Sequence, residues 1–170
     1  QHPFDVRRDL LDAGQIYNSN RYSLLGVLQS LGCEVHDYPI LIDDLGASRD
    51  ALADAASRFD LIITSGGVSV GEEDHLKQAI RELGELHLWR LAIQPGKPLA
   101  FGAVRRGTAE GGEALFVGLP GNPASALVGA ELFLAPLLAA LQGAQAENRF
   151  ETAVLGQALA ANGPRDHYIR

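Results

Sequence analysis

The chain has 170 residues, of which 46% are hydrophobic, and its charged side chains give a formal net charge of −7. This apolar content suffices for one globular core, and the acidic balance excludes an extended nucleic-acid surface, which needs a basic face. The single cysteine excludes a disulfide framework. The N-terminal sequence has no apolar core of a signal peptide, and no uninterrupted apolar run reaches the roughly 18 residues of a membrane span, so we expect a cytoplasmic protein.

Apolar periodicity predicts alternating helices and strands along the chain. In the first helix, leucines recur every three or four residues after Ser19 and Asn20, and Gly32 ends the pattern. The predicted helices cover 21–31, 48–57, 74–83 and 122–141. The predicted strands cover 34–42, 59–64, 86–93, 99–104 and 114–117.

This alternation predicts an α/β fold of three layers, a mostly parallel sheet with helices on both faces. We assign residues 1–145 to this domain. The polar segment 143–149 predicts a linker, and residues 150–159 predict the first strand of a C-terminal β domain, so that 146–170 form a second unit. In open α/β sheets, ligands bind beyond the carboxyl ends of the strands.

Three turns at such strand ends have the composition of an anion site: TSGGVSVGEED at 64–74 (the first turn), QPGKP at 94–98 (the second turn) and LPGNPAS at 119–125 (the third turn). In the first turn, Gly66 and Gly67 permit positive φ, and the hydroxyls of Ser65 and Ser69 can donate to phosphate oxygens. Asp74 either holds Mg²⁺ or caps the following helix.

The other two turns add a cation and a helix start. The prolines of the second turn restrict the backbone around Lys97, so that little entropy is lost when its ammonium is presented. In the third turn, Asn122 is a good N-cap, Pro123 suits the first helical position, and Ser125 adds a hydroxyl. Together the turns predict a site for a phosphate-rich ligand.

Four segments carry a family resemblance: GQIYNSNRYSLL (14–25), DLIITSGGVSVGEEDHLK (60–77), QPGKPLAFG (94–102) and GLPGNPASAL (118–127). In this order they resemble the molybdopterin-binding domain of MoeA-type molybdenumtransferases, a family that includes the gephyrin E domain. The resemblance implies a MogA-like fold in a homodimer with further domains. It also implies an enzyme of molybdenum cofactor biosynthesis, which inserts molybdate into adenylylated molybdopterin and releases AMP.

The resemblance also implies site residues. Asp74, Asp43 and Lys97 would be catalytic, with Mg²⁺ at Asp74. Ten residues would bind the substrate: Ser65, Gly66, Gly67, Ser69, Pro98, Pro120, Gly121, Asn122, Pro123 and Ser125.

The chain departs from the family at two places. Gln94 stands where relatives have a lysine, and the family's first strand, with its TGDEL-like segment, is not visible before Gly14. Two alternatives remain. One is a MogA-type molybdopterin adenylyltransferase, whose usual Arg-Asp pair differs from Glu73-Asp74 here. The other is a non-catalytic scaffold of the gephyrin kind.

Overall fold

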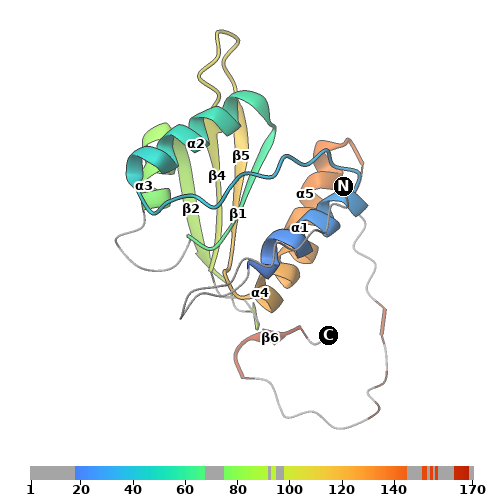
Figure 1. Cartoon of the computed structure of the whole chain (residues 1–170). Helices are drawn as coiled ribbons and strands as arrows, with labels where there is room; N and C mark the ends of the chain where they lie inside the picture. The colour runs from blue at the N-terminus through green and yellow to red at the C-terminus, as the bar shows by residue number, and fades with distance from the viewer. Residues whose placement is uncertain are drawn as a thin grey trace, which may run out of the picture.

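The structure is a computed structural model, which describes residues 18–67, 75–91, 93–94, 98–144, 151–152, 154, 156 and 163–168. Its centre is a four-stranded sheet with the strand order β1, β5, β4, β2 (Figure 1). These strands are β1 (Leu61–Ser65), β2 (Gly84–Arg90), β4 (Pro98–Arg105) and β5 (Glu113–Leu119). Two short strands, β3 (Ile93–Gln94) and β6 (Asp166–His167), pair with each other in parallel.

The sheet is mixed, and the expectation of a mostly parallel sheet is wrong for the described strands. β1 and β5 are parallel, whereas β4 runs antiparallel to both β5 and β2. The reason is the short connection between β4 and β5, residues 106–112, because parallel neighbours need a crossover of about a dozen residues or more. The segment 91–97 between β2 and β4 is also too short for a parallel crossover, and these two strands are antiparallel as well.

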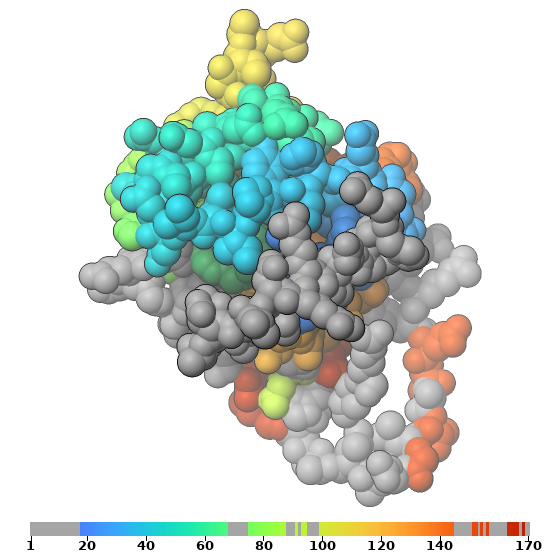
Figure 2. Space-filling view, in the orientation of Figure 1, coloured from blue at the N-terminus to red at the C-terminus, as the bar shows by residue number. Residues whose placement is uncertain are grey.

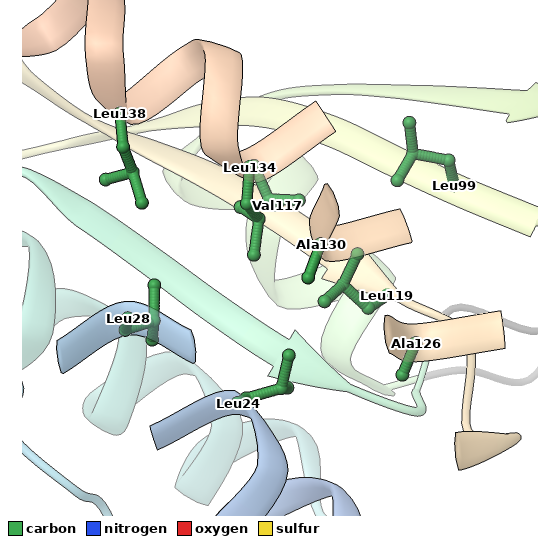
Figure 3. Packing of buried hydrophobic residues seen from close by; sticks show 9 residues of the cluster. All are labelled: Leu24, Leu28, Leu99, Val117, Leu119, Ala126, Ala130, Leu134 and Leu138. Carbon is green, nitrogen blue, oxygen red and sulfur yellow. The ribbon is translucent and has the colours of Figure 1, made fainter. Parts of the chain in front are cut away.

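Helices cover both faces of this sheet, so the predicted three-layer α/β fold is confirmed (Figure 1). On one face lie α1 (Ser19–Ser30) and the helix that begins with α4 (Pro123–Gly129). Their leucines and alanines pack on β4 and β5 through the cluster drawn in Figure 3: Leu24, Leu28, Leu99, Val117, Leu119, Ala126, Ala130, Leu134 and Leu138. On the other face, α2 (Leu45–Arg58) and α3 (His75–Leu83) pack on Val104, Ala114 and Phe116.

The helix predicted over 122–141 is continuous but changes its winding. After α4 come a π-helical stretch, η1 (Ala130–Leu134), and α5 (Ala135–Leu141). Ala135 N–H donates to Ala130 C=O, and this wide turn accommodates Pro136, which has no N–H and would disturb a regular helix. By length and composition alone this helix could cross a membrane, yet one face of it packs in the core.

The strand predicted over 34–42 does not form, and the strand predicted over 150–159 lies mostly outside the described residues. Residues 34–42 are extended but pair with no described strand, and Ile40 and Ile42 are 73% and 77% exposed. Pro39 lacks an N–H, and side-chain contacts such as Arg21 with Asp37 at 2.7 Å hold the segment instead. Of 150–159, the described residues 151, 152, 154 and 156 lie in no strand. The domain division at residue 145 stays a prediction.

Candidate functional site

In the described part of the first turn, residues 64–67, the two glycines have the positive φ that the sequence predicts. β1 ends at Ser65, and Gly66 and Gly67 follow with φ of +88° and +66°. The Gly66 N–H donates to the Leu119 carbonyl at 2.9 Å, which continues the parallel pairing of β1 with β5 for one more step. A side chain at Gly67 would meet Leu76, because an added Cβ would lie 2.8 Å from Leu76 Cδ2. Both glycines directly after β1 therefore have a conformation or a neighbour that disfavours any other residue.

The third turn lies directly beside the first turn. Ser65 and Leu119 are register partners at the carboxyl ends of the two parallel strands. A Cβ built on Gly121 would lie 3.8 Å from Gly66 Cα. Two segments that are more than fifty residues apart in the sequence thus meet at one end of the sheet, as their position after parallel strands predicts. The 106–112 loop projects from the opposite end (Figures 1 and 2).

Asn20 joins the two turns, and the sequence did not predict this role. Its Nδ2 donates to Ser65 Oγ at 2.5 Å and to the Gly121 carbonyl at 2.8 Å, and the residue is only 6% exposed. The helix begins earlier than expected, at Ser19, with Asn18 as the N-cap. Asn20 is therefore a buried residue of α1. A second asparagine two residues after the cap, in a helix position that asparagine disfavours, was the available signal.

Two buried oxygens beside the first turn have no hydrogen-bond partner among the described residues: Asn20 Oδ1 and Thr64 Oγ1. They lie on opposite faces of β1, because alternate residues of a strand point to opposite sides. Accordingly, Ile63 and Ile62 pack in different core clusters. Unsatisfied buried polar atoms are rare, so their presence on both sides of Ser65 distinguishes this end of the sheet.

The third turn begins the long helix as predicted, with Asn122 as the N-cap and Pro123 as the first helical residue. Asn122 Oδ1 accepts from the Ser125 N–H at 3.1 Å and from the Ser125 hydroxyl at 3.3 Å. Ser125 is 7% exposed. Its hydroxyl proton is thus already engaged inside the turn, whereas the Ser65 oxygen accepts from Asn20.

The described flanks of the second turn lie at the same end of the sheet. β4 begins at Pro98, and its register with β5 places Ala100 beside Gly118, one residue before the end of β5. One small hollow is lined by Ile93 and Leu99, which flank the second turn, and by Pro120 and Ser125 of the third turn. Lys97 itself lies outside the described residues. Gln94 is exposed, and its carbonyl accepts from Tyr168 N–H at 2.8 Å.

Of the two predicted carboxylates, Asp43 and Asp74, the structure describes Asp43. Asp74 lies outside the described residues, as does the predicted site residue Ser69. Asp43 precedes α2, and its Oδ1 lies 3.1 Å from Nδ1 of His75, the residue after Asp74. The Asp43 side chain is 91% exposed. Lys77, two residues further along α3, is buried. Within the described ranges, no group of three His, Cys, Asp or Glu side chains could hold a metal ion.

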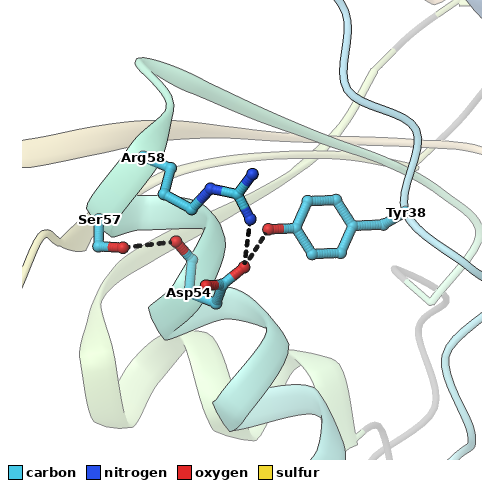
Figure 4. Close-up of polar contacts among 4 residues, drawn as sticks. All are labelled: Tyr38, Asp54, Ser57 and Arg58. Carbon is cyan, nitrogen blue, oxygen red and sulfur yellow. Dashed lines mark hydrogen bonds and ion pairs between the residues drawn. The ribbon is translucent and has the colours of Figure 1, made fainter.

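A separate polar cluster lies on the outer side of α2 (Figure 4). Asp54 accepts from the Tyr38 hydroxyl and from Arg58 Nη1, the latter at 3.2 Å, and Ser57 Oγ donates to the Asp54 carbonyl at 2.7 Å. The hydrogen bond from Tyr38 lowers the pKa of Asp54. Burial is the larger cause of the raised pKa of Tyr38, and the hydrogen bond to Asp54 is the next. These residues pin the extended segment 34–42 to α2.

Comparison with known proteins supplies the family. The model of the probable molybdopterin binding domain matches residues 8–140. The chain belongs to this family. A molybdopterin molybdenumtransferase from Haemophilus influenzae is 46% identical over 133 residues, 78% of this chain and 31% of the relative. Another from Nostoc is 33% identical over 162 residues, 94% of this chain and 36% of the relative. Gephyrin from Dictyostelium discoideum is 32% identical over 158 residues, 82% of this chain and 22% of the relative.

Solved structures agree with this molybdopterin-binding fold. The molybdopterin biosynthesis MoeA protein from Pyrococcus horikosii matches with a TM-score of 0.66 and 32% identity, over 80% of this chain and 32% of that protein. MoaB from Thermus thermophilus matches with a TM-score of 0.55 and 25% identity, over 78% of this chain and 89% of MoaB. The chain thus spans about a third of the two molybdenumtransferases and most of the smaller MoaB.

Proposed function

We propose that this domain serves in molybdenum cofactor biosynthesis as the molybdopterin-binding part of a molybdopterin molybdenumtransferase. The reaction inserts molybdate into adenylylated molybdopterin and releases AMP. Its support is the family match together with one observation, the meeting of the first and third turns at the ends of two parallel strands. The 46% identical relative bears the name of this enzyme.

The substrate chemistry suits this end of the sheet. Adenylylated molybdopterin carries phosphoryl groups, and molybdate is a tetrahedral oxyanion, so both need hydrogen-bond donors and positive charge. Ser65, whose oxygen accepts from Asn20, would supply a hydroxyl donor from the first turn, and Lys97 would supply an ammonium from the second turn. Such fixed donors accelerate phosphoryl cleavage by stabilising charge that develops in the transition state.

Two carboxylates, those of Asp74 and Asp43, would also be catalytic groups of this site. Mg²⁺ at Asp74 would neutralise phosphoryl charge when bound. The contact of Asp43 with His75 supports a position for Asp43 near the start of α3. A cytoplasmic homodimer, with further domains from a longer polypeptide, is part of the same proposal.

The test is AMP release from adenylylated molybdopterin by the purified chain in the presence of molybdate and Mg²⁺, with the longer gene product measured in parallel. We expect molybdate-dependent release by at least the longer protein, and its loss in Asp74→Ala. The neighbouring substitution Glu72→Ala is the matched control and keeps the activity. If molybdate does not increase AMP release by either protein, the proposal is contradicted.

The alternative function is MogA-type adenylylation of molybdopterin. It is favoured by one observation, that this chain covers 89% of the stand-alone MoaB protein. In that case ATP and molybdopterin would give the adenylylated product and pyrophosphate without molybdate. A protein that performs neither reaction, yet folds, would be left with the gephyrin-like scaffold function.

A further inference from the structure

A single side chain controls how the hydroxyl of the first turn can be used. The amide nitrogen of Asn20 has no lone pair to offer, so it must donate in both of its contacts. The carbonyl of Gly121 can only accept, which fixes the orientation of the amide group. In the contact with Asn20, Ser65 Oγ therefore accepts, and its own proton points elsewhere.

We infer that Asn20 is a positioning residue, which fixes the Ser65 hydroxyl as a hydrogen-bond donor to a tetrahedral oxyanion held between the first and third turns. This inference rests on the proposed function, because it concerns how that same site takes its phosphoryl or molybdate group. It names a residue of α1 that acts through Ser65 and sets the distance between the two turns.

The comparison with Ser125 supports this assignment. Both serines stand at the converging turns, but the Ser125 hydroxyl donates to Asn122 inside its own turn. At Ser65 the asparagine is the donor, so that the serine proton stays available. An oxyanion accepts hydrogen bonds only, and Ser65 is therefore the better prepared of the two hydroxyls.

The second polar atom of the Asn20 side chain also supports the inference. Its Oδ1 is buried without a described partner, which is unfavourable for folding. An apolar residue would avoid that cost if the position served only to pack α1 on the sheet. Groups that break a packing rule in this manner are characteristic of functional sites.

The substitution Asn20→Asp tests the inference because aspartate has nearly the same shape but, when ionised, only accepts hydrogen bonds. It would accept a hydrogen bond from the Ser65 hydroxyl, place a carboxylate oxygen against the Gly121 carbonyl, and repel an anion. We expect the affinity for AMP, for molybdate, or for both to fall by about tenfold or more, as measured by titration calorimetry on the full chain. The two ligands tell which oxyanion contacts Ser65. Asn18→Asp is the matched control, because aspartate also caps helices, and it should bind within about twofold of the unmodified chain.

A double-mutant cycle separates positioning from simple destabilisation. Ser65→Ala should weaken binding by a similar factor. The cycle uses Asn20→Ala because it introduces no charge that would repel the anion by itself, and adding Asn20→Ala to Ser65→Ala should cause little further loss. Melting temperatures report folding for each variant.

Wild-type affinity in Asn20→Asp, or independent losses that multiply in the double variant, would overturn the inference while leaving the proposed function intact. If the unmodified chain binds neither AMP nor molybdate, both the inference and the proposed function are wrong for this chain.

Discussion

Two polar clusters each join segments that are distant in the sequence, and they differ in their access to solvent. Asn20 links α1 to both converging turns and is buried. Tyr38 and Arg58 meet at Asp54 on the outer side of α2, where the side chains of Asp54 and Arg58 are about half exposed. Both clusters have an amide or carboxyl group with two partners.

Burial makes these similar contacts unequal. A polar group that loses its partner on the surface is rehydrated, whereas a buried one keeps the full cost of its desolvation. The buried cluster should therefore determine both stability and the shape of the ligand site, while the exposed cluster should only hold the segment 34–42 in place.

Removal of the buried amide is the largest expected effect. Asn20→Ala removes the donor of two hydrogen bonds, to Ser65 Oγ and to the Gly121 carbonyl, each worth about 1 kcal/mol, so the free energy of unfolding should fall by about 2 kcal/mol. Urea denaturation of the purified chain measures this change. Asp54→Ala also removes two side-chain contacts and is the matched control. Equal losses in the two variants would contradict the comparison.

The glycine turn should respond next. Alanine at Gly67 would have to adopt φ near +66° and displace the tip of Leu76, which should cost about 1–2 kcal/mol. Gly32 also has positive φ, at +79°, but an added Cβ there meets nothing within 4 Å. Gly32→Ala therefore measures the backbone strain alone. The difference between the two variants, from the same denaturation experiment, isolates the contact with Leu76, and it should be small but positive.

Sequence reasoning found most of the buried framework and missed the contact that joins it. The glycine turns and the cap at Asn122 have local signals, and both were predicted. The antiparallel direction of β4 was missed, although the short loop after it determines the pairing. The contacts of Asn20 depend on residues 45 and 101 positions away, so no local pattern contained them. The roles of Asp74, Lys97 and Ser69 stay predictions.

The cap of the long helix should have a moderate effect. Asn122→Ala removes the acceptor of the Ser125 N–H and should destabilise the chain by about 1 kcal/mol. Asn18 caps α1 in the same way, but its contact with the Arg21 N–H is exposed, whereas Asn122 contacts the buried Ser125, which makes Asn18→Ala the matched control. If burial matters as the comparison holds, loss of Asn122 exceeds loss of Asn18 in thermal denaturation. The reverse order would place the sensitive end of the molecule elsewhere.

The smallest effect is expected from Tyr38→Phe, and its dependence on pH identifies the exposed cluster. The hydrogen bond from Tyr38 holds the pKa of Asp54 below its ordinary value of 3.8, so the stabilisation exists above that pH and is lost as the pH falls through the lowered pKa. Burial and Asp54 hold the pKa of Tyr38 above 10.0, so the stabilisation exists below that pH and is lost as the pH rises through the raised pKa.

The difference in unfolding free energy between the unmodified chain and Tyr38→Phe should therefore be constant between about pH 5 and 9 and shrink on either side. Denaturation curves at a series of pH values measure it. Tyr22→Phe, another partly exposed tyrosine, serves as the control. A difference that grows toward acidic pH would mean that Tyr38 stabilises the protonated form of Asp54, and the solvent-exposed cluster would then not act as a simple charge-assisted contact.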